Sequence, residues 1–378
     1  MQDMLMMIPG PTNLPPEVRE AIGRPTMYHR GVEFTDLLQR CTAGLRDVFQ
    51  TSEDVLILSC SGTGGVEAAI TNLIGPDDRV LVVRTGKFGE RMGEIAEQYG
   101  ALVTWVDVEP GQAVQPRQLV DVLSRRPFKA LLFVQNETST GVTQNVATLA
   151  KIARDYHCLS IVDCVSGMAG IPVRTQHWGL DAVVAGSQKA FMLPPGLAFV
   201  SLSDRAWRVA ADCKTPRYYL DLIAARESLH KGQTPYTPAV NLIQGLAASL
   251  ALLQAEGMAS VYARHAAAAG AVRAASRAIG LELFADPAYA SNVVTAIRSP
   301  EGLDSSDLVK QMAEDSGILI SGGQGELKGK IFRIGHMGVF DVDVISATVA
   351  AMAGALVKLG YPCDPAVAKK EAVGAYGG

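Results

Sequence analysis

The sequence has no excess of positive charge. Its 378 residues include 34 lysines and arginines against 38 aspartates and glutamates, which gives a net charge of −4. It also has no long basic run and no stretch in which basic and aromatic residues alternate, so the electrostatic footprint of a nucleic-acid-binding protein is missing. We therefore expect no nucleic-acid partner.

Long hydrophobic runs are missing as well. No stretch approaches the roughly 18 uncharged apolar residues from which a membrane helix is recognised. The beginning of the sequence, residues 1–8, is apolar but short, carries Asp3 and runs directly into Pro9-Gly-Pro11, which is unlike a signal peptide or an anchor. We expect no membrane partner and a cytoplasmic protein.

Cysteine and histidine show no spacing that is typical of a disulfide framework or a metal site. The six histidines have no metal-ligand pattern, and the cysteines have no CxxC pair, so we expect reduced packing thiols and no metal. Cys60 and Cys164 lie beside the motifs described below. A catalytic thiol at either position stays open, although no histidine-containing signature accompanies them.

The sequence contains short, nearly continuous apolar runs, which are typical of buried strands, and longer segments with a helical period of apolar residues. They predict strands over 54–58, 79–83, 102–108, 130–134, 159–163 and 197–202 and around Val183, with helices between most of them. Such alternation is typical of an α/β fold with a mainly parallel sheet between helices. The length predicts a second, smaller domain.

Four polar motifs follow the expected strands. In an α/β sheet, ligands bind at the carboxyl ends of the strands, so these motifs should converge on one site. They are Ser61-Gly-Thr-Gly-Gly65, Gln135-Asn-Glu-Thr-Ser-Thr-Gly141, Asp163-Cys-Val-Ser-Gly167 and Ser187-Gln-Lys189.

The first motif lies between the strand over 54–58 and a helix expected over 66–74. Glycines allow a tight turn, and the free N–H groups of the first helical turn bind anions, which suits a phosphate. Many glycine-rich turns hold no ligand, so a purely structural turn is the alternative. A nucleotide-binding dehydrogenase is disfavoured because the turn lacks the full GxGxxG pattern.

Lys189 and Asp163 are the candidate catalytic residues. A lysine among apolar residues and prolines loses solvation, which lowers the pKa of its amine and favours Schiff-base chemistry; a solvent-facing strand cap is the alternative. The carboxylate of Asp163 could face a cationic ring nitrogen; a helix cap or a structural ion pair is the alternative. With the phosphate-binding turn, this set fits pyridoxal phosphate.

Eight motifs in order show that the sequence resembles the class V, fold-type I pyridoxal phosphate aminotransferases, close to the alanine/serine–glyoxylate or serine–pyruvate group. They are Pro9-Gly-Pro-Thr-Asn-Leu-Pro, Ser61-Gly-Thr-Gly, Glu137-Thr-Ser-Thr-Gly, Val162-Asp-Cys-Val-Ser, Gly186-Ser-Gln-Lys-Ala, Pro194-Pro-Gly, Thr234-Pro-Tyr-Thr-Pro and Phe332-Arg-Ile-Gly. The resemblance implies a large domain with a seven-stranded type of sheet and a small C-terminal α+β domain. We expect an N-terminal segment over 1–20, the large domain over 21–258 and the small domain over 259–378.

The resemblance also implies roles for individual residues around the cofactor. Lys189 would hold the aldehyde and move the substrate proton, and Asp163 would face the ring nitrogen. Thr138 would lie near the ring hydroxyl or the substrate. Val165 would lie against the ring, and Thr63, Gly64, Gly65 and Gln188 would surround the phosphate.

Two positions depart from relatives. Phe88 stands where many relatives stack a tryptophan on the ring, and a core residue at a helix start is its alternative reading. Gly65 replaces a larger residue of some relatives, so we expect it to lack a side-chain contact to the phosphate.

The same resemblance also implies which residues bind the substrate and which reach the active site of the partner subunit. Arg333 would hold the substrate carboxylate, with an internal pair to a glutamate as the alternative, and Gly10 would add a backbone contact. Tyr236 and Thr237 would reach the phosphate of the neighbouring subunit in a homodimer. Tyr28, His29 and Arg30 would close the site.

The expected reaction is a ping-pong transfer of the amino group from alanine or serine to glyoxylate or pyruvate. Aspartate, aminoethylphosphonate and ureidoglycine remain alternative donors. A class V lyase would need a mobile-loop cysteine, and none occurs over 321–330. A non-enzymatic protein is disfavoured because Lys189, Asp163 and Arg333 are all intact.

Overall fold

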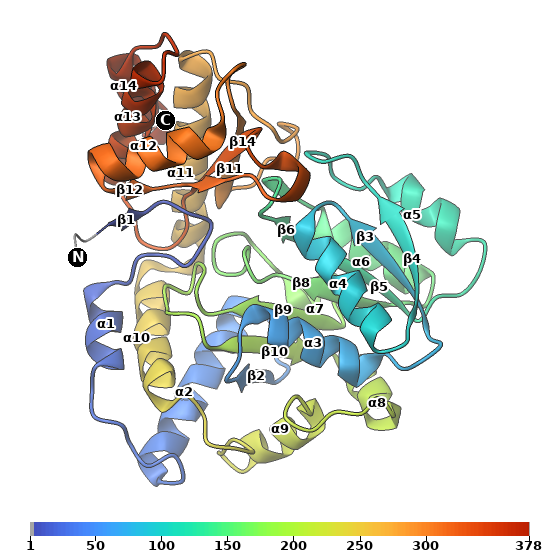
Figure 1. Ribbon diagram of the computed structural model, residues 1–378. Helices are drawn as coiled ribbons and strands as arrows, with labels where there is room; N and C mark the ends of the chain where they lie inside the picture. Colours follow the sequence, from blue (N-terminus) through green and yellow to red (C-terminus); the bar gives the residue numbers. More distant parts are fainter. Residues whose placement is uncertain (1–3, 378) are drawn as a thin grey trace.

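A seven-stranded sheet forms the centre of the larger part of the molecule (Figure 1). The computed structural model describes residues 4–377, so residues 1–3 of the expected N-terminal segment and residue 378 lie outside it. Strand β10 runs antiparallel to both of its neighbours, and the other paired strands are parallel, which confirms the predicted α/β class. The order is β2 (Val55–Leu58), β10 (Ala198–Leu202), β9 (Ala182–Gly186), β8 (Leu159–Asp163), β5 (Ala130–Val134), β3 (Arg79–Arg84) and β4 (Leu102–Asp107).

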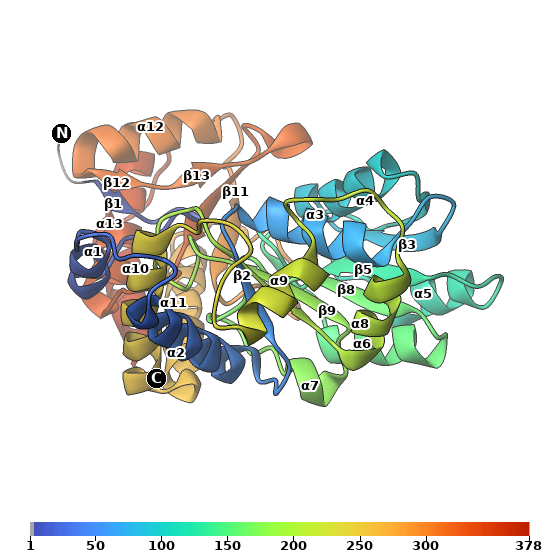
Figure 2. The same cartoon turned by 90° about the horizontal axis from the view of Figure 1, so that it is seen from below.

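Helices cover both faces of this sheet (Figure 2). Side chains alternate along each strand, so Val80 and Val82 pack into one core cluster while Leu81 and Val83 pack into the other. Because both faces are buried, the strands are almost continuously apolar. One cluster includes α3 (Gly62–Leu73), α4 (Lys87–Gln98), α8 (Asp204–Asp212) and α9 (Leu222–His230); the other includes α2 (Val32–Phe49), α5 (Pro116–Leu123), α6 (Val146–Asp155) and α10 (Val240–Glu256).

Helix α3 begins four residues earlier than the sequence predicts, at Gly62 instead of Val66. Its first backbone bond runs from the Gly65 amide to the Ser61 carbonyl, 3.1 Å away. A Cβ atom on Gly65 would lie 2.8 Å from both Val184 and Ala198. Glycine therefore lets the helix approach the sheet closely, and this packing offsets its low helix propensity.

The C-terminal part is a smaller α+β unit, as predicted. Its antiparallel sheet has the order β11 (Val294–Arg298), β14 (Ile331–Gly335) and β13 (Ser321–Gly322). A further short strand of this unit, β12 (Ile318–Leu319), pairs with the N-terminal segment: it runs parallel to β1 (Leu5–Met6), and Figure 1 shows the two strands side by side. Three of its helices are α11 (Met258–Ala278), α12 (Ser305–Ser316) and α13 (Val342–Lys358).

The tail after Pro362, in which the sequence shows no clear pattern, forms helix α14 (Pro365–Tyr376). Asp364 caps this helix, since its carboxylate accepts from the Ala366 amide at 2.8 Å. Ala368 and Ala372 are fully buried in the core of the small domain. Shorter elements complete the chain: α1 (Pro16–Ile22), α7 (Thr175–Trp178), the hairpin of β6 (Asn136–Glu137) and β7 (Val142–Thr143), and the 3-10 turn η1 (Gly325–Leu327).

Within residues 4–377, no single helix combines the length and the apolar character that a membrane crossing needs. Helices α10 and α11 meet these criteria only as a pair, and they are bent by 86° relative to each other.

Candidate active site

Lys189 lies just after β9, beneath the N-terminal segment. Its Nζ atom donates to the Pro9 carbonyl, and the Thr12 hydroxyl donates to the Lys189 carbonyl at 3.1 Å. A Cβ atom on Gly10 would lie 2.7 Å from Nζ, so only glycine permits this contact. The pKa of Lys189 is lowered to about 8, chiefly by burial; the charge of Asp163 opposes this shift and that of Arg333 adds to it.

Asp163 is the last residue of β8 and is 7% exposed. Its Oδ1 atom accepts from the Val165 amide at 2.8 Å, and no ion pair among the described residues involves it. Burial raises the pKa of Asp163 to about 6, against the opposing charges of Arg91 and Lys189. This buried carboxyl group therefore lacks the close cation that would stabilise its ionised form.

The first turn of α3 faces Lys189 across a cavity of about 90 Å³. Six of the predicted cofactor residues line it: Thr63, Phe88, Asp163, Val165, Gln188 and Lys189. The Oε1 atom of Gln188 is buried and has no hydrogen-bond partner within the described chain. The remaining lining residues are Ser61, Gly62, Val66, Arg91 and Met92.

Gly64 and Gly65 lie in the same helical turn but are not among the residues that line the cavity. A Cβ atom on Gly64 would meet the Cys60 side chain at 2.9 Å, and one on Gly65 would meet the sheet. A larger residue at position 65 would therefore point away from the cavity. This corrects the expectation that glycine there removes a side-chain contact to the phosphate.

Arg333 lies in β14 and is 5% exposed. Its Nη1 atom donates to the Thr138 carbonyl at 2.9 Å, and Nε and Nη2 donate to the Gly322 carbonyl at 3.1 and 2.8 Å. Burial lowers the pKa of Arg333 to about 10. These partners are neutral, and none of the ion pairs among residues 4–377 involves this guanidinium, so an internal pair with a glutamate is not observed.

Glu137 opens one of the eight motifs, but the sequence suggested no role for it. It is fully buried; its Oε2 atom accepts from the amides of Phe88 and Gly89 at 3.1 Å each, and Oε1 accepts from the amide and hydroxyl of Ser139. Burial raises the pKa of Glu137. This side chain thus anchors the start of α4, the helix that brings Phe88 to the cavity.

Tyr236 and Thr237 lie outside this cavity, in the loop before α10. Tyr236 stacks on Tyr219 with ring centroids 5.4 Å apart, and Thr237 lies 3.5 Å from His29. Arg30 donates to the Gln233 side chain and to the Thr234 carbonyl, both at 2.8 Å. Within one chain, these residues lie apart from the cavity, and Arg30 anchors the loop over 233–235 that leads to them.

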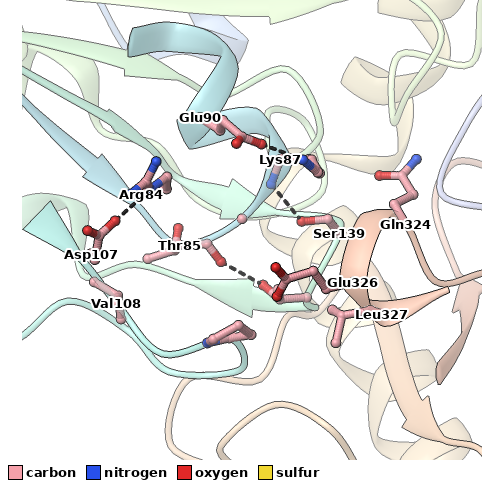
Figure 3. Close-up of a pocket in the computed structure, with 13 residues that line it drawn as sticks. Arg84, Thr85, Lys87, Glu90, Asp107, Val108, Ser139, Gln324, Glu326 and Leu327 are labelled. Atoms are coloured by element: carbon pink, nitrogen blue, oxygen red, sulfur yellow. Dashed lines mark hydrogen bonds and ion pairs between the residues drawn. The ribbon is translucent and has the colours of Figure 1, made fainter. Parts of the chain in front are cut away.

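A larger cavity of about 380 Å³ lies between the carboxyl ends of β3 and β4 and the small-domain segment around η1 (Figure 3). Its cations are already paired: Arg84 lies 2.5 Å from Asp107 and Lys87 lies 2.6 Å from Glu90. Figure 3 shows both pairs. None of the residues that the sequence analysis assigned to the site lines it. Size alone therefore does not identify the active site.

The observed residues fit pyridoxal phosphate. A desolvated lysine amine suits its aldehyde, the Asp163 carboxyl group, which has no ion-pair partner among residues 4–377, suits its ring nitrogen, and the open N-terminus of α3 suits its phosphate. Burial raises the pKa of Cys60 to about 11 and that of Cys164 well above its ordinary value, which disfavours a nucleophilic thiolate at either position. Among the described residues, no group of three or more His, Cys, Asp or Glu side chains could share a metal ion.

Comparison with known proteins addresses the family directly. The sequence profile of the Aminotransferase class-V family matches residues 9–330. The chain is 37% identical to L-aspartate–glyoxylate aminotransferase of Paracoccus denitrificans over 94% of this chain and 92% of the relative. It is 34% identical to serine–glyoxylate aminotransferase of Methylorubrum extorquens over 94% of this chain and 90% of the relative.

Two further similarities point to the same fold. The small subunit of a soluble hydrogenase of Synechococcus sp., a differently named protein, is 41% identical over 96% of this chain and 95% of its own length. The solved structure of ureidoglycine–glyoxylate aminotransferase from Bacillus subtilis superposes with a TM-score of 0.95 at 27% identity, covering 100% of this chain and 99% of that one. The predicted resemblance is confirmed: the chain belongs to the class-V aminotransferase family and is a fold-type I aminotransferase with pyridoxal phosphate as its cofactor.

Proposed function

We propose that this aminotransferase moves the amino group of alanine or serine to glyoxylate or pyruvate in a ping-pong reaction. The observation that carries the proposal is a set of three groups whose charges lack close counterions. These are the Lys189 amine, the Asp163 carboxyl group and the Arg333 guanidinium.

Pyridoxal phosphate, when bound, supplies an aldehyde for the amino group and a ring that withdraws electrons from the substrate Cα. Lys189 would hold the aldehyde carbon, Asp163 would keep a proton on the ring nitrogen, and Phe88 and Val165 would enclose the ring. Thr63, Gly64, Gly65 and Gln188 would bind the phosphate, and Thr138 would lie beside the ring or the substrate.

Lys189 is suited to move the substrate proton. With a pKa of about 8, a fraction of its Nζ atoms is unprotonated at neutral pH and can accept a proton from the substrate Cα. Arg333 would bind the substrate carboxylate bidentately, and the Gly10 backbone would contact the same group. Burial is the largest cause of the lowered pKa of both Lys189 and Arg333.

Three cations outside the active-site cavity are already engaged, which favours a donor with a single carboxylate. Arg84 and Lys87 are paired with acids, and Arg30 is engaged by the loop over 233–235. A second carboxylate at any of these three residues would therefore have to displace an existing interaction. Aspartate remains the first alternative because a relative at 37% identity is named for it, and ureidoglycine is a second one.

The test has two stages. Borohydride reduction of the protein with pyridoxal phosphate, followed by peptide mass analysis, should place the added mass on Lys189; Lys189→Ala should lose the adduct, and Lys151→Ala, which changes an exposed lysine, should keep it. Absence of an adduct at Lys189 in the unaltered protein would refute the assignment. Glycine formation from glyoxylate is then compared for L-alanine, L-serine and L-aspartate, and a higher kcat/KM with aspartate would refute the proposed donors.

We also propose a homodimer with a shared active site, a cytoplasmic location, and the division into segments 1–20, 21–258 and 259–378. Support for the dimer is an exposed aromatic surface around Tyr236, where Tyr218 is 80% exposed and Tyr219 is 50% exposed. Large exposed apolar patches are typical of interfaces. Tyr236 and Thr237 would there contact the phosphate held by the partner.

A further inference from the structure

Arg91 lies at the mouth of the active-site cavity and has no role in the function proposed above. It is exposed, it lines the cavity with Thr63 and Lys189, and its Nη1 atom donates to the Thr63 hydroxyl at 3.2 Å. Its guanidinium carbon lies 5.0 Å from the centroid of the Phe88 ring. No carboxylate among residues 4–377 lies within ion-pair distance of it.

The charge balance of the cavity calls for such a cation. The proposed phosphate ligands Thr63, Gly64, Gly65 and Gln188 are all neutral, and Lys189 is consumed when it binds the aldehyde. Arg91 is then the remaining cationic side chain among the residues that line the cavity. A phosphate that carries nearly two negative charges binds more tightly where a guanidinium is close.

The direction of the hydrogen bond adds a second argument. A hydroxyl group has one proton to donate and can accept from another donor. Because Arg91 donates to the Thr63 oxygen, the Thr63 proton stays available for an anion on the cavity side. The contact with Phe88 holds the guanidinium beside the ring that would cover the cofactor.

We propose that Arg91 is a further cofactor-binding residue, which supplies positive charge to the phosphate site and orients the Thr63 hydroxyl toward the phosphate. This inference rests on the proposed position of the phosphate at the start of α3. It predicts that Arg91 acts on the phosphate group and has little effect on the rest of the cofactor.

The structure offers a matched control. Arg126 makes the same two kinds of contact elsewhere, since it lies 5.3 Å from the Phe128 ring centroid and donates to the Thr104 hydroxyl at 2.8 Å. It is also exposed. Arg126→Ala therefore removes an equivalent stacked arginine that does not line the cavity.

The experiment measures the dissociation constants of pyridoxal phosphate and of pyridoxal for cofactor-free protein by absorbance titration. Arg91→Ala should weaken pyridoxal phosphate binding by about 10- to 100-fold, the range of one charge-assisted hydrogen bond, and change pyridoxal binding by less than about twofold. Arg91→Lys should restore part of the loss. Arg126→Ala should match the unaltered protein. The phosphate preference is the ratio of the dissociation constant of pyridoxal to that of pyridoxal phosphate. Added salt should reduce this ratio less in Arg91→Ala than in the unaltered protein.

The inference is overturned if Arg91→Ala keeps the unaltered ratio of the two dissociation constants, or if it weakens both ligands equally and so acts only through the Phe88 ring. Thr63→Ala distinguishes a failure of the role of Arg91 from a failure of the proposed phosphate position. If Thr63→Ala lowers the phosphate preference while Arg91→Ala does not, only the role of Arg91 fails. If neither variant lowers it, the proposed position of the phosphate fails as well.

Discussion

The ionised form of Asp163, which the proposed function requires, destabilises the folded protein when the cofactor is absent. Burial raises the pKa of Asp163 from the ordinary value of 3.8 to about 6. The folded protein therefore binds more protons than the unfolded chain between these values, and stability is lost as the pH rises through this window. Two pKa units correspond to about 3 kcal/mol.

Asp163→Asn should therefore stabilise the cofactor-free protein by about 1–3 kcal/mol at pH 7 and by almost nothing at pH 4, while activity is lost. The asparagine Oδ1 atom can keep the bond to the Val165 amide. Urea unfolding at both pH values measures the difference. Asp181→Asn is the control, because Asp181 is equally buried but paired with Arg205, and it should destabilise. An Asp163→Asn protein no more stable than the unaltered one at pH 7 would contradict the prediction.

At Gly10, the active site leaves no room for a side chain. The φ of this residue is +98°, and a Cβ atom would lie 2.6 Å from Lys189 Cδ and 2.7 Å from Nζ. Gly10→Ala should cost about 1–2 kcal/mol of stability from the backbone conformation, and should also displace Lys189 and lower kcat by more than about tenfold.

Gly302→Ala separates these two effects. Gly302 has a φ of +77° with nothing within 4 Å of the added atom, so this variant should lose similar stability and keep full activity. Thermal unfolding and steady-state kinetics measure the two quantities. Equal kcat in Gly10→Ala and Gly302→Ala would show that the contact with Lys189 is unimportant.

At the scale of elements, the start of α4 depends on one buried carboxylate. Glu137 accepts two bonds on each oxygen, from the amides of Phe88 and Gly89 and from the amide and hydroxyl of Ser139. Glu137→Gln must turn its NH₂ group toward at least one backbone N–H, which leaves donors unsatisfied and costs about 1–3 kcal/mol.

The same substitution should weaken pyridoxal phosphate binding, because it releases the helical turn that carries Phe88. Asp304→Asn is a suitable comparison: Asp304 caps α12 by accepting from the Ser306 amide at 2.7 Å, and an asparagine can make the same bond. Chemical unfolding and cofactor titration should show losses for Glu137→Gln alone. Similar losses in both variants, or none in either, would remove the special role of Glu137.

At the scale of the whole molecule, the proposed dimer makes a quantitative prediction. Lys189→Ala and the double variant Tyr236→Ala/Thr237→Ala should each be nearly inactive. If Tyr236 and Thr237 serve the partner's cofactor, each mixed dimer of the two variants has one intact site. Co-expression in equal amounts should then restore about a quarter of the sites, since half of randomly formed twofold dimers are mixed.

Activity of co-expressed and of separately purified variants, with the dimer fraction from light scattering, measures this restoration. A control pair, Lys189→Ala with Asp163→Asn, should restore little activity if both residues act within one chain beside the same cavity. Absence of restoration in the first pair, with mixed dimers demonstrated, would place Tyr236 and Thr237 in the site of their own chain or outside both.

Much of the fold could be predicted because buried parallel strands are almost continuously apolar, and the strands over 130–134 and 159–163 match the structure residue for residue. Helix α14 escaped prediction because its apolar face is formed mainly by alanines, whose burial depends on packing against α11 and α13. The early start of α3 escaped as well, because the glycines are helical only through their contact with the sheet.

The sequence by itself determined the family, the cofactor and the polar groups at the strand ends, because Lys189, Asp163 and Arg333 are polar residues within apolar segments. Only the tertiary structure decided how these groups are surrounded. It placed Gly10 against Lys189, Glu137 beneath the start of α4 and Arg91 on the Thr63 hydroxyl, pairs separated by 28 or more positions. Burial, counterions and hydrogen-bond direction set the chemistry of a site, and they depend on neighbours that the chain brings together only when it folds.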